Sequence, residues 1–275
     1  MTVDWDGGIN FRSYDQVESL DNYQNKAELE AYRSERLDFC AERSAFVLKV
    51  SGLSSPLNVV DVGSGSSALL YAMASEGVLK SGMGIELSES RHRFAEQWKT
   101  EKGFLNVVNR HTDFANVTFD KDATDLFLCI DNTLSLIGAE DNGYARHLAN
   151  SAFGALRSGG CLVIEIHNQA KVLASLVDDE RQFWRELPET NAFKFALYRQ
   201  SFNRALNLIR SESIYVRRDG DERRKADMEA AYTQAALEAL LSSAGFVNFK
   251  AYGGYDFSAF DIRQSEYLVV LASKP

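Results

Sequence analysis

The middle of the chain alternates short apolar runs with stretches of helical periodicity. The apolar runs, each predicted to form a strand, are Leu57–Val62, Gly82–Leu87, Phe104–Val108, Asp125–Ile130 and Cys161–Ile166. Helical stretches lie between most of them, and another precedes them from about Lys26 to Val50. Strands that alternate with helices form βαβ units, whose parallel sheet is covered on both faces. The pattern therefore predicts a doubly wound α/β fold.

The pattern changes after residue 192. Two runs rich in aromatic and β-branched residues, Phe193–Asn203 and Leu206–Arg218, predict an antiparallel hairpin. The charged stretch Arg217–Glu229 is interpreted as a solvated turn. Two further runs, Phe246–Tyr252 and Glu266–Ser273, are predicted to be the closing strands, which brings the main sheet to about seven strands.

Composition narrows the classes of partner. The 275 residues are 45% hydrophobic and 25% charged, with a net charge of −9, so a nucleic-acid partner is not expected. The three cysteines contain no CxxC spacing and predict neither a disulfide framework nor a zinc site. No apolar run approaches the ~18 residues of a membrane span, and the N-terminus is acidic. We expect a soluble, cytoplasmic protein without a membrane partner.

A glycine-rich loop follows the first predicted strand and opens a helix. It reads Asp61-Val-Gly63-Ser-Gly65-Ser-Ser67. Glycines at this point let the backbone approach a ligand closely, and the helix N-terminus offers free N–H groups. Glu86, 23 residues beyond Gly63, ends the second strand, where a carboxylate can accept both hydroxyls of a ribose. The combination indicates a nucleoside-type cofactor.

The loop leaves two cofactor classes open. Read to Ala68, it matches the dinucleotide pattern G-x-G-x-x-A, which is typical of an NAD(P)-dependent oxidoreductase. Asp61, however, would lie awkwardly beside a pyrophosphate and suits a cationic ligand. Asp113 and Phe114 follow the third strand, where a carboxylate and a ring can bind an adenine.

Five segments together carry a family resemblance. They are Val59–Ser67, Gly84–Ser88, Asp113-Phe114, Leu156–Val163 and Leu240–Phe246. With them the chain from about residue 58 to 274 resembles class I S-adenosylmethionine-dependent methyltransferases, especially those that modify small molecules. The resemblance implies a Rossmann-like, doubly wound seven-stranded sheet with an antiparallel last strand.

The resemblance also implies a cofactor site. By this resemblance, the glycine-rich loop would line the methionine moiety of S-adenosylmethionine. The carboxylate at position 86 would hold the ribose, and positions 113 and 114 would hold the adenine. The implied cofactor-binding residues are Asp61, Gly63, Ser64, Gly65, Glu86, Leu87, Asp113, Phe114 and Ile130. The family usually has a third glycine where this chain has Ser67, which leaves the backbone path after Gly65 open.

Polar residues end the fourth and fifth strands, beside the expected methyl group. Asp131 and Asn132 are predicted to orient the acceptor. His167 is the best candidate for a general base because its ordinary pKa lies near neutral pH. A purely structural, hydrogen-bonded histidine is an equally good interpretation. The spacing of these groups matches no known metal site, so no metal is predicted.

The N-terminal residues 1–55 resemble the lid and helix that close over the cofactor in this family, and residues 56–275 would form the methyltransferase domain. The hairpin would be inserted at about 190–220 and form the opposite wall. The predicted substrate-binding residues are Tyr14, Tyr23, Asn168, Arg199 and Tyr255. Arg199 is a candidate to bind a carboxylate or phosphate of the substrate.

We therefore expect in-line transfer of a methyl group from S-adenosylmethionine to a nitrogen or oxygen of a small-molecule acceptor, leaving S-adenosylhomocysteine. An NAD(P)-dependent oxidoreductase and a non-catalytic scaffold that binds S-adenosylmethionine stay open as alternatives. The sequence does not reveal the acceptor, the number of methyl groups added or the oligomeric state, for which a homodimer is one option.

Overall fold

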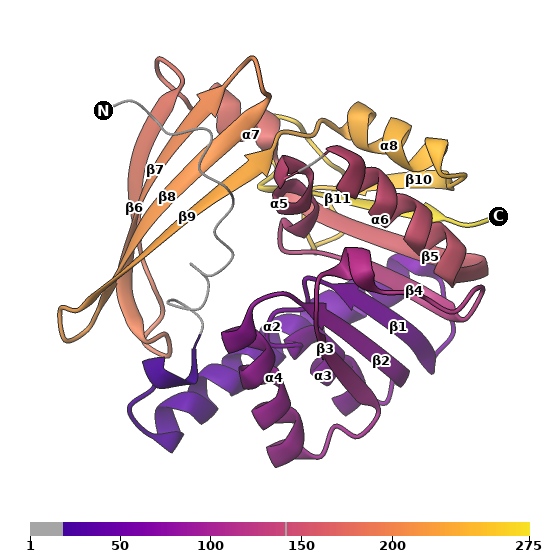
Figure 1. Cartoon of the computed structure of the whole chain (residues 1–275), viewed down its shortest axis with the longest axis horizontal. Helices are drawn as coiled ribbons and strands as arrows, with labels where there is room; N and C mark the ends of the chain where they lie inside the picture. The colour runs from indigo at the N-terminus through magenta and orange to yellow at the C-terminus, as the bar shows by residue number, and fades with distance from the viewer. Residues whose placement is uncertain (1–18, 141) are drawn as a thin grey trace.

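The computed structural model describes residues 19–140 and 142–275. Two sheets dominate it: a seven-stranded sheet flanked by helices and a four-stranded antiparallel sheet that stands beside it (Figure 1). Tyr14, which the sequence predicts to bind substrate, lies outside the described residues.

The seven-stranded sheet has the predicted topology. Its strands are β1 (Leu57–Val62), β2 (Leu79–Glu86), β3 (Val107–His111), β4 (Thr124–Cys129), β5 (Leu156–His167), β10 (Val247–Tyr252) and β11 (Tyr267–Ser273). They lie in the order β10-β11-β5-β4-β1-β2-β3. Strand β11 runs antiparallel to both β5 and β10, and the other neighbours are parallel. The prediction of an antiparallel last strand is confirmed.

Helices cover both faces of this sheet. One face carries α2 (Lys26–Ser51), α3 (Ala68–Ser75) and α4 (Glu89–Lys102), and the other carries α5 (Thr133–Glu140), α6 (Asn142–Ala155) and α8 (Gln234–Ser243). The shorter elements are η2 (Leu20–Asn22), η3 (Phe114–Asn116) and α7 (Gln169–Ala174). The side chains of Asn25, Ser88 and Thr233 accept hydrogen bonds from backbone N–H groups at the starts of α2, α4 and α8. These caps fix where the long helices begin.

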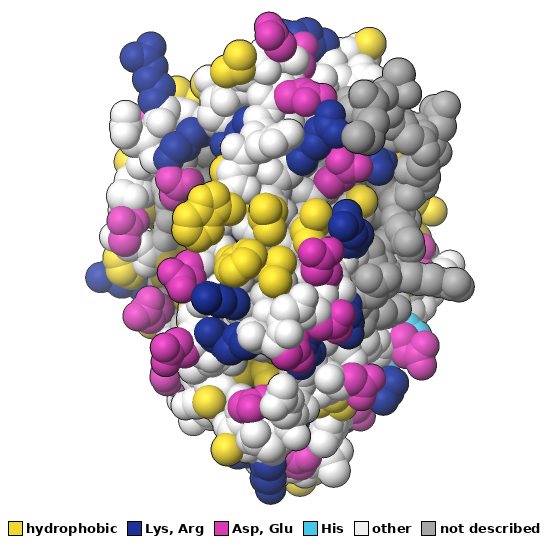
Figure 2. All heavy atoms as spheres, turned by 90° about the vertical axis from the view of Figure 1, so that its left-hand side faces the viewer, with side chains coloured by type: hydrophobic (Ala, Val, Ile, Leu, Met, Phe, Trp, Pro, Cys, Tyr) yellow, Lys and Arg dark blue, Asp and Glu magenta, His cyan; other side chains and the backbone are white. Residues whose placement is uncertain are grey.

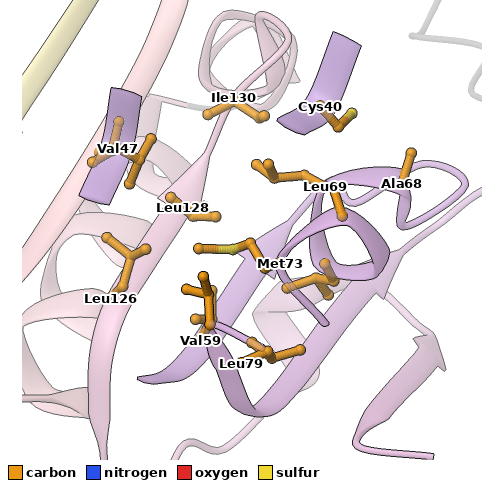
Figure 3. Packing of buried hydrophobic residues seen from close by; sticks show 14 of the residues in the cluster. Cys40, Val47, Val59, Ala68, Leu69, Met73, Leu79, Leu126, Leu128 and Ile130 are labelled. Carbon is orange, nitrogen blue, oxygen red and sulfur yellow. The ribbon is translucent and has the colours of Figure 1, made fainter. Parts of the chain in front are cut away.

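The central strands are buried on both faces, which explains their continuous apolar runs. In β4, Leu126 and Leu128 belong to the core under α2 and α3, whereas Phe127 belongs to the core under α5 and α6. Figure 3 shows Val47 of α2 and Met73 of α3 on the same side of the sheet as Leu126 and Leu128. Helix α2 is thus packed against the sheet through the same core as the first βα unit.

The four-stranded sheet is larger than the predicted hairpin. Its strands are β6 (Glu180–Glu186), β7 (Phe193–Asn203), β8 (Leu208–Arg217) and β9 (Glu222–Ala230), paired antiparallel in chain order. The two central strands are the predicted ones. The interpretation of Arg217–Glu229 as a solvated turn is wrong, because most of it forms β9. Charged and apolar residues alternate from Lys225 to Ala230, but here the charged side chains face the inside, which reverses the usual pattern.

The two faces of this sheet differ in polarity. Its inner face, toward the seven-stranded sheet, carries the charged side chains of Lys225, Asp227 and Glu229, and the two carboxylates among them are buried. On the outer face, Trp184 and Leu197 are neighbours in register and are 68% and 43% exposed. Figure 2 shows hydrophobic side chains gathered near the middle of this outer side, with charged residues around them. The inner face of β9 is therefore charged, whereas the outer face of β6 and β7 exposes apolar side chains.

Candidate active site

One cavity of about 500 Å³ lies between the two sheets. It is bounded by the carboxyl ends of β1, β2 and β4, by α2, and by the inner face of the four-stranded sheet. All nine predicted cofactor-binding positions line it: Asp61, Gly63, Ser64, Gly65, Glu86, Leu87, Asp113, Phe114 and Ile130. The volume falls in the range of small-molecule and cofactor sites.

The glycine loop is held against the end of β2. The backbone N–H groups of Gly63 and Ser64 both donate to the carbonyl of Ile85, at 2.8 and 3.1 Å. Gly63 has a φ of +72°, and a Cβ there would lie 2.4 Å from Thr133 Oγ1. Ser67 also adopts the left-handed conformation (φ 58°), and its hydroxyl donates to Asn109 Oδ1 at 2.8 Å. The serine at the family's third glycine position thus keeps a left-handed backbone.

The carboxylate of Glu86 links the glycine loop to the start of helix α4. Its Oε2 accepts the N–H of Gly65 at 2.8 Å, and its Oε1 accepts the N–H of Ser88 at 2.7 Å. The side chain is buried but lines the cavity. These bonds fix both oxygens at the cavity wall, where a carboxylate still has lone pairs for further donors.

Asp61 is the most isolated acid of the site. It is 2% exposed, and its Oδ1 has no hydrogen-bond partner among the described residues. Burial, followed by the nearby carboxylates of Asp131 and Glu86, raises the pKa of Asp61 well above its ordinary value. A cation bound in the cavity would reverse that effect, so this position suits the ammonium group of a ligand.

The remaining cofactor positions are fixed by local turns. Asp113 Oδ1 accepts the N–H of Ala115 at 2.9 Å at the start of η3, and the buried ring of Phe114 follows at once. The carbonyl of Ile130 accepts the N–H of Thr133 at 3.2 Å. Leu87 is 40% exposed and lines the cavity.

A strained turn follows β4. Asp131 and Asn132 both have positive φ angles, 52° and 64°, which cost energy in non-glycine residues. Two hydrogen bonds to β5 hold the turn: the N–H of Asn132 donates to the Glu165 carbonyl at 3.2 Å, and the N–H of His167 donates to Asn132 Oδ1 at 3.1 Å. The turn brings all three predicted catalytic residues, Asp131, Asn132 and His167, to the cavity wall.

A buried arginine of α2 holds this turn from the other side. Arg43 Nη1 lies 2.6 Å from Asp131 Oδ1 and 3.5 Å from Glu165 Oε2. Its guanidinium lies over the rings of Phe39 and Tyr255, at 4.3 and 4.6 Å from their centroids. Desolvation works to raise the pKa of Asp131, but the charges of Arg43 and then Arg36 outweigh it and lower that pKa. Asp131 is therefore held as a carboxylate.

His167 faces the cavity with a carboxylate behind it. Its Nδ1 lies 3.6 Å from Glu229 Oε2, and Glu229 Oε2 also accepts the Gln169 amide at 3.1 Å. Burial works to lower the pKa of His167, but the attraction of Glu229 outweighs it, so the pKa is raised. The imidazole is thus oriented and made more basic, as a general base requires.

Of the four predicted substrate-binding residues that the structure describes, one lines the cavity. Tyr23 lines the cavity, with its ring 5.2 Å from that of Tyr32. Asn168, Arg199 and Tyr255 do not line it.

Each of these three has another partner. Asn168 caps α7, and its amide donates to the carbonyls of Ile262 and Ser265. Arg199 lies on the outer face of the four-stranded sheet and pairs with Glu180 at 2.8 Å. Tyr255 donates its hydroxyl to Glu165 at 2.5 Å, beneath the cavity. The structure therefore does not place these three side chains on the cavity wall.

The sequence interpretation missed several residues that line the cavity. Arg43 and Thr133 were not singled out, nor were the three inner-face residues of β9, Lys225, Asp227 and Glu229. The β9 residues follow one another at every second position, which is a strand signal, but their charge indicated a turn.

Within residues 19–140 and 142–275, no three or more His, Cys, Asp or Glu side chains are grouped as a metal site. The helices of the same residues include none that is both long and apolar enough to cross a membrane.

A family model described as a methyltransferase domain matches residues 53–237. Among solved structures, the chain is similar to the CcbJ methyltransferase from Streptomyces caelestis, with 20% identity, a TM-score of 0.72, and coverage of 86% of this chain and 90% of that one. It is also similar to CalS10, described as a SAM-bound amino pentose methyltransferase from Micromonospora echinaspora involved in calicheamicin biosynthesis. There the identity is 16%, the TM-score 0.66 and the coverage 92% and 98%.

A third similar structure is the sugar N-methyltransferase KedS8 from Streptoalloteichus sp ATCC 53650, with 14% identity, a TM-score of 0.58, and coverage of 90% of this chain and 87% of that one. At such identities the similarity shows the fold. No curated protein is recognisably similar to the chain in sequence.

The close approach of Gly63 to Thr133 yields a first prediction. Gly63→Ala and Gly65→Ala both place a Cβ on a backbone of positive φ, at a cost of roughly 1–2 kcal/mol each. Only Gly63→Ala also drives the Cβ into Thr133, whose Oγ1, Cγ2 and Cβ all lie within 3.0 Å. We expect its free energy of unfolding in urea to fall by roughly 1–3 kcal/mol more than that of Gly65→Ala. Equal losses would contradict the close approach.

The buried arginine yields a second prediction. Arg43→Gln leaves two carboxylates without their cation and should lower the free energy of unfolding by about 3–5 kcal/mol at pH 7. The matched control Arg204→Gln breaks an exposed pair with Asp179 and should change stability little.

The same variant should show a defined pH dependence. The Arg43–Asp131 contribution is present above the ordinary aspartate pKa of 3.8 and is lost as pH falls through the lowered pKa of Asp131. The gap between wild type and Arg43→Gln should therefore narrow in acid. A gap that widens in acid would refute the assignment.

Proposed function

The chain belongs to the methyltransferase-domain family, and on this premise we propose that it transfers a methyl group from S-adenosylmethionine to a nitrogen or oxygen of a small-molecule acceptor. The family model covers more than half of the 275 residues, including the glycine loop and both strand ends that carry the candidate catalytic residues. This match favours the methyltransferase over the oxidoreductase for which the loop alone left room.

The proposed donor site rests on the loop and three acidic residues. S-adenosylmethionine supplies a methyl group already activated on a sulfonium. Asp61, with its unpartnered Oδ1, would hold the ammonium of the methionine moiety. Glu86 would accept the ribose hydroxyls, and Asp113 with Phe114 would contact the adenine. One observation carries the proposal: Asp61 and Glu86 line the same cavity, together with the glycine loop.

The proposed acceptor site lies on the other side of the same cavity. Asp131 and Asn132 would orient the acceptor, and His167 would take the proton that the nucleophile loses. Glu229 positions the imidazole and stabilises its protonated form. The CalS10 and KedS8 structures are described as amino pentose and sugar methyltransferases, which supports a small polar acceptor here.

We further propose that residues 1–55 cover the donor site, while residues 56–275 form the methyltransferase domain with the four-stranded sheet as its insertion. Tyr23, Tyr32 and Arg36 come from the first of these parts and line the cavity. Its long helix α2 also supplies Arg43. The ion pair of Arg43 with Asp131 therefore links residues 1–55 to the turn after β4. A cytoplasmic location stays a prediction from composition.

The donor site yields a third prediction, measured by calorimetric titration. S-adenosylhomocysteine should bind the purified protein and NADH should not. Glu86→Gln should weaken the binding of S-adenosylhomocysteine by about 10-fold or more, since bonds to a charged acceptor are the stronger ones. Glu42→Gln, an exposed change on α2, is the matched control. Unchanged affinity in Glu86→Gln, or binding of NADH instead, would refute the donor site.

Methyl transfer itself separates an enzyme from a scaffold. The wild-type protein is incubated with S-adenosylmethionine and a panel of amines, aminosugars and phenols, and methylated products are identified by mass spectrometry. Donor binding without any product would favour the scaffold.

The His167–Glu229 pair yields a fourth prediction, for the pH dependence of kcat/KM. His167 acts as a base only when neutral, so activity rises as pH passes its raised pKa. Glu229→Gln removes the charge that raises this pKa, and the acid limb should therefore move to lower pH. His167→Ala should lower kcat by about 100-fold or more.

Glu222→Gln, on the same strand but exposed, is the control for Glu229→Gln. An acid limb that stays in place in Glu229→Gln would show that His167 is not the base.

A further inference from the structure

A row of polar side chains crosses the inner face of the four-stranded sheet and ends at the cavity. Arg181, Gln200, Ser211 and Asp227 are successive partners in register, one from each strand. Arg181 Nε donates to Gln200 Oε1 at 2.6 Å, and Gln200 Nε2 donates to Ser211 Oγ at 2.8 Å. A sheet face that served only for packing would carry apolar residues here. The row therefore needs a reason beyond packing.

Asp227, the last member of the row, has one carboxylate oxygen that accepts no hydrogen bond from the described residues. Asp227 lines the cavity and is only 6% exposed. Its Oδ2 lies 2.8 Å from Lys225 Nζ, but its Oδ1 has no hydrogen-bond partner among the described residues. Burial raises the pKa of Asp227 even with Lys225 beside it. An unsatisfied buried oxygen costs stability, and here the cavity is the side from which a partner can come.

We propose that Asp227 and Lys225 form a subsite for a hydroxyl group of the methyl acceptor, so that the acceptor class is a hydroxylated small molecule. A hydroxyl can donate to the carboxylate and accept from the ammonium at the same time, which neither an apolar group nor a protonated amine can do. The inference rests on the proposed methyl transfer, since it assigns the acceptor of that same site.

The subsite stands at a useful distance from the base. Glu229, which orients His167, is two residues further along the same face of β9, a spacing of roughly 7 Å along the strand. A six-membered ring can therefore present its nucleophile to His167 and a hydroxyl further round the ring to Asp227. A site built to bond a hydroxyl also rejects analogues without it, because the buried groups are then left unpaired.

The test uses the full-length protein and a matched pair of amines, trans-4-aminocyclohexanol and cyclohexylamine, beside the acceptors that the wild type methylates. Every methylated acceptor should carry a hydroxyl, and aminocyclohexanol should have the higher kcat/KM of the pair. Asp227→Asn should raise KM for hydroxylated acceptors about 10- to 100-fold, with the affinity for S-adenosylhomocysteine unchanged. Asp221→Asn, in the exposed turn before β9, is the control.

The outcomes separate the two proposals. If the wild type binds S-adenosylhomocysteine and methylates acceptors, but KM is unchanged in Asp227→Asn or cyclohexylamine is preferred, the subsite is wrong and the methyl transfer stands. If no acceptor is methylated, the methyl transfer fails and the subsite fails with it. Should Asp227→Asn not fold, Lys225→Gln removes the donor half of the subsite and should raise the same KM. A merely structural role for the pair would not separate KM from donor affinity.

Discussion

Acidic side chains crowd around one cavity, and the way each negative charge is compensated shapes the site. Arg43 compensates Asp131, His167 compensates Glu229 and Lys225 lies beside Asp227 on the same strand. The first two pairs join elements far apart in the chain. Arg43 links α2 to the end of β4, while His167 and Glu229 link β5 to β9. Ion pairs between separate elements therefore help to hold the walls of the cavity together.

Asp61 stands apart from this pairing. The charge of Arg43 only partly offsets the burial of its carboxyl group, and its neighbours Asp131 and Glu86 repel a further negative charge. Such an arrangement is unfavourable in the unliganded protein and becomes favourable when a cation enters. A donor with both an ammonium and a sulfonium suits this requirement, whereas a pyrophosphate does not.

Local patterns in the sequence predicted the fold, and the nine positions that they marked for a cofactor all line the cavity. The glycine loop and Glu86 were found because each follows directly on an apolar strand, so their positions depend on short-range geometry. The acceptor side depends on contacts between distant segments: Arg43 and Asp131 are 88 residues apart. No local pattern identifies such partners. Arg199 was misplaced because alternation along β7, not residue type, decides which side of the sheet it faces.

Strand β6 begins and β9 finishes at the same end of the four-stranded sheet, so the chain leaves the α/β unit and returns to it on one side. The donor loop and the catalytic turn lie entirely outside this insertion. The whole four-stranded sheet, or alternate residues of it, can therefore change without changing the glycine loop or the turn after β4. Such a change would alter the acceptor side of the cavity and leave the proposed donor side intact. For the protein engineer, the stretch from Glu180 to Ala230 is a natural unit to transplant between relatives.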